Sequence, residues 1–202
     1  MPRQFIITLM AVNRVGVLAA ITQALAELGG DLQEVSQTIL KNYFTMILSV
    51  EFPEDRDPEV VLDHFRSVCR PFGIVIDLKD PAANDSITLG RPRPADTYYL
   101  TGRGEDTPGL LRKIAARLAE ENIDILNMYG TREEPGGECA MILELSIPED
   151  VDKGNLRENL RSLSSVIGLE ARLDHEAECR FPSPHHAFRH LSVDRPVHEI
   201  VE

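Results

Sequence analysis

The sequence predicts an α+β protein made of two tandem βαββαβ units. Three observations support this prediction: a segment that occurs twice, the same order of strand-like and helix-like segments around both copies, and a proline-rich stretch between them. In both copies a polar residue, a glycine and an apolar pair are followed by apolar residues at helical spacing. The copies keep a constant offset, because Gly16 and Gly109 are 109 − 16 = 93 residues apart, as are Leu25 and Leu118 (118 − 25 = 93).

The first copy begins with residues 5–12, which are rich in β-formers and apolar on both faces and therefore predict an interior strand. Asn13 is predicted to be the N-cap of an amphipathic helix, which Gly29-Gly30 ends. The remaining predicted elements are strands at about 31–40 and 43–52 around the turn Lys41-Asn42, a helix around 60–68, and an alternating strand over 74–78.

The second copy predicts the same order of elements. Strands are expected at about 97–104, 123–131, 139–147 and 169–173, and helices at about 108–121 and 152–166. The order βαββαβ is the ferredoxin-like arrangement, an antiparallel four-stranded sheet with two helices on one face. We therefore predict domains at 1–80 and 96–175, a proline-rich linker at 81–95, and a C-terminal tail at 176–202 that matches no motif.

Composition and charge exclude several classes of function. The net charge of −12 disfavours direct binding to nucleic acid, which needs basic patches. No run approaches the ~18 to 20 apolar residues of a membrane helix, so a cytoplasmic protein without membrane association is expected. The cysteines, Cys69, Cys139 and Cys179, are too far apart for a CxxC motif. No phosphate-binding loop, nucleophile elbow or metal motif occurs, so we expect no catalysis, no cofactor and no metal.

The start of the second repeated helix carries a family resemblance. Asp106, Pro108, Gly109, Leu110 and Leu111 form the pattern Asp-x-Pro-Gly-Leu-Leu, and this pattern within a βαββαβ unit resembles the ACT domain family. The first copy departs from it, with asparagine and valine in place of the aspartate and proline. Two such units without a catalytic domain, joined by a Pro/Arg-containing linker, resemble the glycine cleavage system transcriptional repressor family. The resemblance covers about residues 3–175.

This resemblance implies a regulatory protein that binds a free amino acid where two ACT units meet, with glycine or serine as the family-level expectation. It also implies a homodimer or higher oligomer, and control of transcription or amino acid metabolism through a protein partner. In the family an asparagine often binds ligand at the start of the second strand, where this sequence has Asp31 and Asp124.

The chemistry of the turn before the first helix of each copy also favours the binding of an amino acid. A helix N-terminus offers unpaired N–H groups to a carboxylate, a glycine lets a ligand approach the backbone, and Asp106 or Asn13 could accept hydrogen bonds from an ammonium. The candidate ligand-binding residues are Asn13, Gly16, Val17, Leu18, Asp31, Asp106, Pro108, Gly109, Leu110, Leu111, Asp124 and Asn127. Two alternatives stay open. Asp106 and Asn13 could be plain N-caps worth ~1 kcal/mol, and the chain could be a structural adaptor that binds a protein partner and no metabolite.

Overall fold

Both halves of the chain form a four-stranded antiparallel sheet in a computed structural model, which describes residues 2–53, 56–84, 95–105, 107–132 and 137–179. The chain divides into unit 1, Met1–Gly90, and unit 2, Arg91–Glu202. Each unit has the element order βαββαβ, so the predicted tandem ferredoxin-like fold is confirmed.

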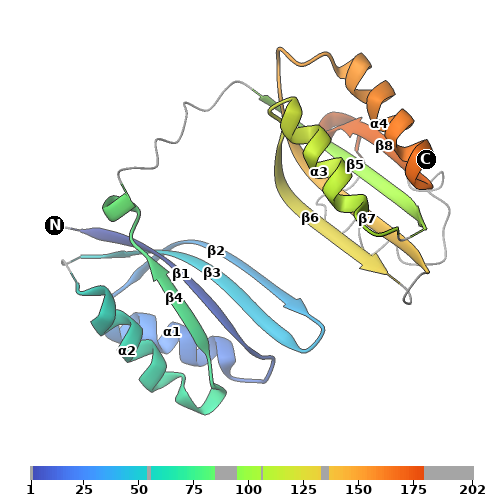
Figure 1. The fold of residues 1–202 in the computed structure, drawn as a ribbon. Coiled ribbons are helices and arrows are strands. Elements are labelled where there is room, and N and C mark those ends of the chain that lie inside the picture. The colour runs from blue at the N-terminus through green and yellow to red at the C-terminus, as the bar shows by residue number, and fades with distance from the viewer. Residues whose placement is uncertain (1, 54–55, 85–94, 106, 133–136, 180–202) are drawn as a thin grey trace. The chain divides into compact units, whose positions relative to one another are not determined.

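In unit 1 the strand order is β2-β3-β1-β4, and both helices lie on the same side of the sheet (Figure 1). The elements are β1 (Arg3–Val12), α1 (Val17–Leu28), β2 (Asp31–Leu40), β3 (Tyr43–Phe52), α2 (Pro58–Val68), η1 (Arg70–Phe72), β4 (Val75–Lys79) and η2 (Pro81–Asn84).

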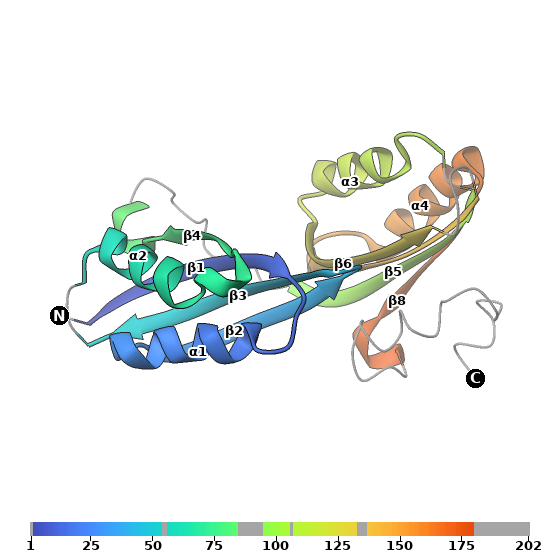
Figure 2. The ribbon, with the colours of Figure 1, turned by 90° about the horizontal axis from the view of Figure 1, so that it is seen from below.

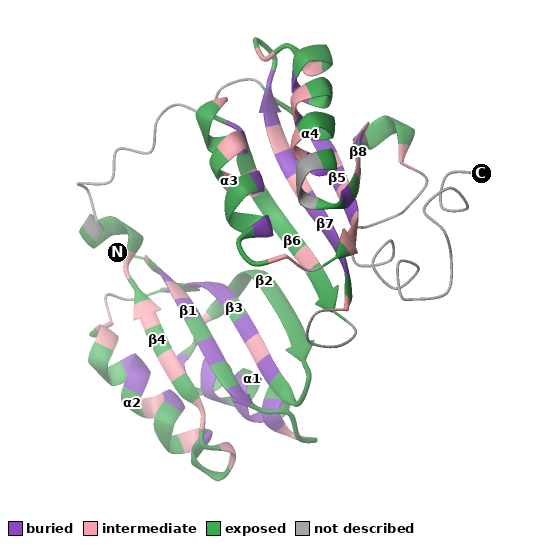
Figure 3. Ribbon diagram, turned by 45° about the vertical axis from the view of Figure 1, so that its right-hand side comes forward, coloured by how far each residue is buried: buried purple, intermediate pink, exposed green. Residues whose placement is uncertain are grey.

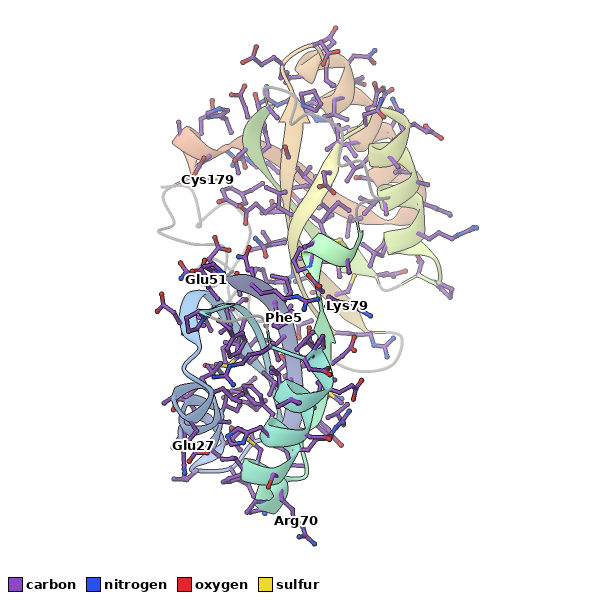
Figure 4. The ribbon with its side chains drawn as sticks, turned by 90° about the vertical axis from the view of Figure 1, so that its left-hand side faces the viewer. Phe5, Glu27, Glu51, Arg70, Lys79 and Cys179 are labelled. Carbon is purple, nitrogen blue, oxygen red and sulfur yellow. The ribbon has the colours of Figure 1, made fainter. Side chains whose placement is uncertain are left out.

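The core of unit 1 lies between this sheet and its helices. Alternate residues of β1, from Phe5 (labelled in Figure 4) to Ala11, are buried, and they pack with α1 and with Phe65 of α2. The two helices also contact each other through polar side chains, since His64 Nε2 of α2 lies 2.9 Å from Glu27 Oε2 of α1. In the described part of unit 1, both helices lie on one face, and the opposite face carries the other β1 residues.

Unit 2 has the strand order β6-β7-β5-β8, again with both helices on one side of the sheet (Figure 2). Its buried residues, among them Leu100, Leu118 and Leu143, form a core between the sheet and the helices. The elements are β5 (Ala95–Glu105), α3 (Leu110–Glu120), β6 (Asp124–Arg132), β7 (Glu138–Pro148), α4 (Lys153–Ile167), β8 (Leu169–His175) and η3 (Glu176–Glu178).

The two units match residue by residue, which allows positions to be compared between them. The register of β2 against β3 shifts between Leu32 and Glu34, and that of β6 against β7 shifts between Ile125 and Asn127, 93 residues further on. The offset becomes 95 from the third strand onward. Ile39 pairs with Phe44 and the corresponding Arg132 pairs with Cys139, so the second hairpin is longer by (139 − 132) − (44 − 39) = 2 residues.

The first helix of each unit begins later than the sequence predicts. The N-cap of α1 is Gly16, with φ 96°, and that of α3 is Gly109, with φ 82°. The prediction that Asn13 is the N-cap is wrong, because its backbone N–H donates to Asn42 O at 2.7 Å and so extends the sheet. A left-handed glycine at the junction fixes the start of the helix instead.

Strand β2 is the most exposed strand of unit 1. All ten of its residues are exposed, although it contains Leu32, Val35 and Ile39 (Figure 3). These three side chains lie on the helix-bearing face of the sheet, since they pair with Val50, Leu48 and Phe44 of β3. Helix α1 therefore leaves this edge strand, with its apolar side chains and its unpaired backbone groups, uncovered.

Candidate functional site

The turn that leads into α3 borders a pocket of about 420 Å³ on the helix-bearing side of the unit 2 sheet. Pro108, Gly109, Leu110 and Leu111 of the predicted motif line it. Leu110 is 4% exposed and belongs to the core, whereas Leu111 is 39% exposed. The rest of the lining comes from Thr107 and Arg112 at the turn and from Met128, Gly130, Thr131, Arg132, Cys139, Ala140 and Met141 on β6 and β7.

The first turn of α3 presents backbone donors to this pocket. Leu110 N donates to Thr107 O at 3.1 Å, and Lys113 N donates to Gly109 O at 3.0 Å. Within the described residues, no acceptor is found for the N–H groups of Leu111 and Arg112, the second and third residues of the helix. Such groups, together with the positive end of the helix dipole, favour an anion.

Two glycines leave room for a ligand beside these donors. Among the described residues, the nearest neighbour of a Cβ built on Gly109 would be Arg112 Nε, at 3.9 Å. A Cβ built on Gly130 of β6 would have as its nearest neighbour Ala140 O, at 3.8 Å. Among the described residues, both positions therefore have room on the pocket side.

The corresponding turn in unit 1 is closed. A Cβ on Gly16 would lie 3.2 Å from the ring of Phe72, and the Arg14 guanidinium stacks over the same ring at 5.6 Å from its centroid. Arg14 Nη2 also donates to Pro71 O at 2.9 Å. At the register position of Gly130, unit 1 has Gln37 (130 − 93 = 37). Val17 is buried in the core and Leu18 is exposed, as the corresponding Leu110 and Leu111 are in unit 2. In unit 1, however, the Phe72 ring occupies the space beside the turn.

The structure separates three predicted site residues from these turns. Asp31 and Asp124 begin β2 and β6, just after the helices end, whereas the turns precede the helices. For Asp124 the separation is the 11-residue length of α3, about 16 Å. Asn127 pairs with Glu144 in the sheet and donates from Nδ2 to Glu144 Oε2 at 2.9 Å, on the face opposite the pocket. Asp106 lies outside the described residues.

Sequence reasoning missed the β6 side of the pocket. Met128 and Gly130 were not proposed, although a glycine inside a predicted strand is a signal for close approach of a ligand or another backbone. The bulge between Ile125 and Asn127 decides which β6 side chains reach the helix face, and nothing in the sequence marks it. Because of this bulge Met128, and not Asn127, faces α3.

Other kinds of site find no support in the described part of the chain. No group of three or more His, Cys, Asp or Glu side chains there is arranged to hold a metal ion. None of the helices within the described ranges is both long enough and apolar enough to cross a membrane.

Comparison with known proteins places this fold in a family. The ACT domain model ACT_6 matches residues 3–79. A UPF0237 protein of Corynebacterium glutamicum is 36% identical over 83 residues, which are 41% of this chain and 93% of that protein. A protein of unknown function from Galdieria sulphuraria superposes with a TM-score of 0.70 at 17% identity, over 87% of this chain and 99% of that one.

A second solved structure, of a proposed glycine cleavage system transcriptional repressor, superposes with a TM-score of 0.59 at 12% identity, over 87% of this chain and 98% of that one. At such identities the two structures show the tandem fold alone. The family rests on the sequence match to the Corynebacterium protein and on the ACT domain model. The chain belongs to the ACT domain proteins of the UPF0237 family.

Proposed function

We propose that this chain is a non-catalytic regulatory protein that binds a free amino acid in the unit 2 pocket. The observation that carries the proposal is the difference between the two turns. The unit 2 turn opens onto a pocket of about 420 Å³, a volume in the range of small-molecule sites. The unit 1 turn is filled by Phe72.

The donors and apolar groups around this pocket suit the parts of an α-amino acid. The carboxylate would accept hydrogen bonds from the N–H groups of Leu111 and Arg112, close to the Arg112 guanidinium. The exposed side chains of Leu111 and Met128 would contact the amino acid side chain. Asp106, three residues before Gly109, is our proposed acceptor for the ammonium, on its sequence position alone.

Regulation would act through association with another chain. The uncovered apolar residues of β2 and its free edge favour pairing with a second copy or with a protein partner. A ligand bound only by the associated form stabilises it by RT ln(1 + [L]/Kd), or ~2.7 kcal/mol at a hundredfold excess over Kd. We propose a homodimer or higher oligomer that influences amino acid metabolism or transcription through such a partner. The fold of the proposed glycine cleavage repressor makes glycine and serine the first amino acids to test.

The same edge strand supports the second candidate function, a structural adaptor that binds a protein partner and no metabolite. Ten exposed residues of β2 could hold a partner without any ligand. The two candidates differ in one measurable property, the response to a free amino acid.

The test is a thermal-shift screen of the standard amino acids, followed by calorimetric titration of the strongest ligand. Gly130→Val should abolish the heat of binding, because its side chain would fill the pocket while β6 tolerates a β-branched residue. Gln37→Val at the matched position of unit 1 should leave the affinity unchanged. Asp106→Asn should weaken binding by removing the negative charge that we propose as the partner of the ammonium. If no amino acid shifts the melting temperature, the adaptor is favoured. Unchanged affinity in Gly130→Val would place the site elsewhere.

A further inference from the structure

The unit 1 sheet has an outer face, which is turned away from α1 and α2 (Figure 1). The β1 residues on it are those between the buried ones, so Thr8 and Met10 belong to this face, together with their partners on β3 and β4. Six side chains of the outer face are large, apolar and between 41% and 70% exposed: Met10, Val12, Leu40, Tyr43, Ile47 and Val75. Contiguous apolar side chains exposed in this way mark an interaction surface.

The outer face also contains a hollow of about 400 Å³. All four strands of the sheet line it, and Ile47 and Val75 contribute apolar surface. Among its described lining residues Asp77 alone carries a charge, and Asp77 Oδ2 lies 3.3 Å from Lys79 Nζ. The hollow therefore offers a partner an almost uncharged surface with room for projecting side chains.

Unit 2 shows that this fold does not require an apolar outer face. The matched residues lie 93 positions later on the first strand and 95 positions later on the third and fourth strands. In unit 2 this face carries ion pairs, such as Arg103 Nη2 with Glu138 Oε2 at 2.8 Å. Four apolar residues of unit 1 correspond to charged ones: Met10 to Arg103, Val12 to Glu105, Tyr43 to Glu138 and Val75 to Glu170.

The distribution of charge favours a second copy of the chain as the partner. Each copy has a net charge of −12, so two copies repel each other unless they meet at a surface with few charges. A two-fold contact places one patch against the same patch, and any single-sign charge there meets its own kind. The apolar end of the outer face has Asp77 beside Lys79, which are opposite in sign, and Glu34 and Glu51 lie toward the other end.

The size of the outer face is sufficient for a dimer. Three of its strands have ten residues and β4 has five. At ~3.4 Å per residue and ~4.8 Å between strands, the face covers roughly 570 Å² in each copy. Two copies would bury about 1,100 Å² together, which is at the low end for a specific interface. A dimer with a dissociation constant in the micromolar range is therefore expected.

We propose that the outer face of unit 1 is an interface between two copies of this chain, in which the two sheets pack face to face. This contact goes beyond the proposed function, because it needs no amino acid and does not use the edge of β2. The apolar side chains of Leu32, Val35 and Ile39 lie on the other face of the sheet and remain available for a separate contact.

The experiment is sedimentation equilibrium of the full chain over the micromolar range, without any amino acid. We expect a dimer that becomes tighter as sodium chloride is added, because salt screens the repulsion between the two acidic copies. Val75→Glu and Tyr43→Glu should each weaken the dimer about tenfold or more, since each places a carboxylate in the apolar contact. The fold accepts glutamate at these positions, as Glu170 and Glu138 of unit 2 show.

Val60→Glu is the matched control, because Val60 is an apolar residue of α2 that is 55% exposed and lies away from the outer face. It adds the same charge and should leave the dissociation constant unchanged. Circular dichroism of each variant establishes that it is folded before sedimentation.

Three results would overturn the proposal: a chain that stays monomeric over this range, an unchanged dimer in both Val75→Glu and Tyr43→Glu, or an equal loss in Val60→Glu. Val35→Glu, at a residue of β2 that is 53% exposed, tests the edge of that strand. Loss of the dimer in Val35→Glu alone would assign the contact to the β2 edge and also contradict the proposal. Because no amino acid is added, a failure of amino acid binding does not affect this test.

Discussion

Gly104→Ala tests how closely the end of β5 approaches the loop before β8. Gly104 lies on the helix-bearing face and pairs with Cys139 and Leu169. A methyl carbon there would overlap Gly168 O and lie 2.9 Å from Leu169 Cα. Both neighbours are backbone atoms, so no side-chain rotation relieves the contact. Overpacking typically costs 1 to 3 kcal/mol, and we expect about 3 kcal/mol here because the backbone itself must move.

Unit 1 supplies the control for this substitution. Ala11 is the matched residue (104 − 93 = 11) and is 5% exposed, so unit 1 accommodates the methyl group that unit 2 excludes. Ala11→Gly should cost about 1.5 kcal/mol, from roughly 0.8 kcal/mol for the lost buried methyl and roughly 0.5 to 1 kcal/mol for glycine in a strand.

Hydrogen exchange measured by mass spectrometry reports the free energy of opening for each unit separately. Gly104→Ala should lower the protection of unit 2 alone, and Ala11→Gly that of unit 1 alone. If Gly104→Ala costs less than Ala11→Gly, the strand and the loop do not approach as closely as described. The reasoning would then fail.

Three further outcomes are expected. Asp152→Ala removes the acceptor for Gly154 N and Asn155 N at the start of α4 and should cost about 1 kcal/mol in thermal unfolding; an unchanged melting temperature would contradict this role. The hydrogen bond from Arg3 lowers the pKa of Asp80. This pair therefore stabilises unit 1 above the unfolded pKa of about 3.9 and loses that effect as the pH falls through the lower folded pKa. The acid unfolding curve of Arg3→Gln should therefore lack this pH-dependent stabilisation. A curve identical to that of the unchanged protein would refute the role of the Arg3–Asp80 pair. Burial raises the pKa of the Cys69 thiol, so iodoacetamide should modify it only as fast as unit 1 opens; rapid labelling of the native protein would show that it is accessible.

Hydrophobic periodicity and the repeated glycine were enough to predict the fold. The run of apolar β-formers at 5–12 indicates an interior strand, and the helical spacing after Gly16 indicates the buried face of a helix, because burial leaves a direct mark on sequence. Helix starts were predicted less well. Asn13 and Asp57 are both polar residues in front of helices, but only Asp57 caps one, with its side chain accepting from Glu59 N.

The sequence predicted the turn on the α3 side of the candidate site and not the β6 residues that face it. The turn around Gly109 could be found because the glycine is repeated at a constant offset and lies in the pattern Asp-x-Pro-Gly-Leu-Leu at the start of a predicted helix. The β6 residues that face it depend on the register shift after Ile125, which moves Asn127 to the other face. The closure of the unit 1 turn depends on Phe72, which is distant in sequence from Gly16. Contacts of this kind are set by tertiary packing, which a local pattern does not encode.

The two additional residues in the second hairpin show where this fold tolerates a change of length. Their insertion leaves every flanking pair of strands in register, from Ile39–Phe44 in unit 1 to Arg132–Cys139 in unit 2. Doubling the length of a flexible loop costs only about 0.6 kcal/mol, so the hairpin end can grow at little cost. Arg132, at that end, also lines the pocket beside Gly109. A cysteine and dye introduced between β6 and β7 would therefore give an optical reporter for the proposed ligand pocket without changing the strands that line it.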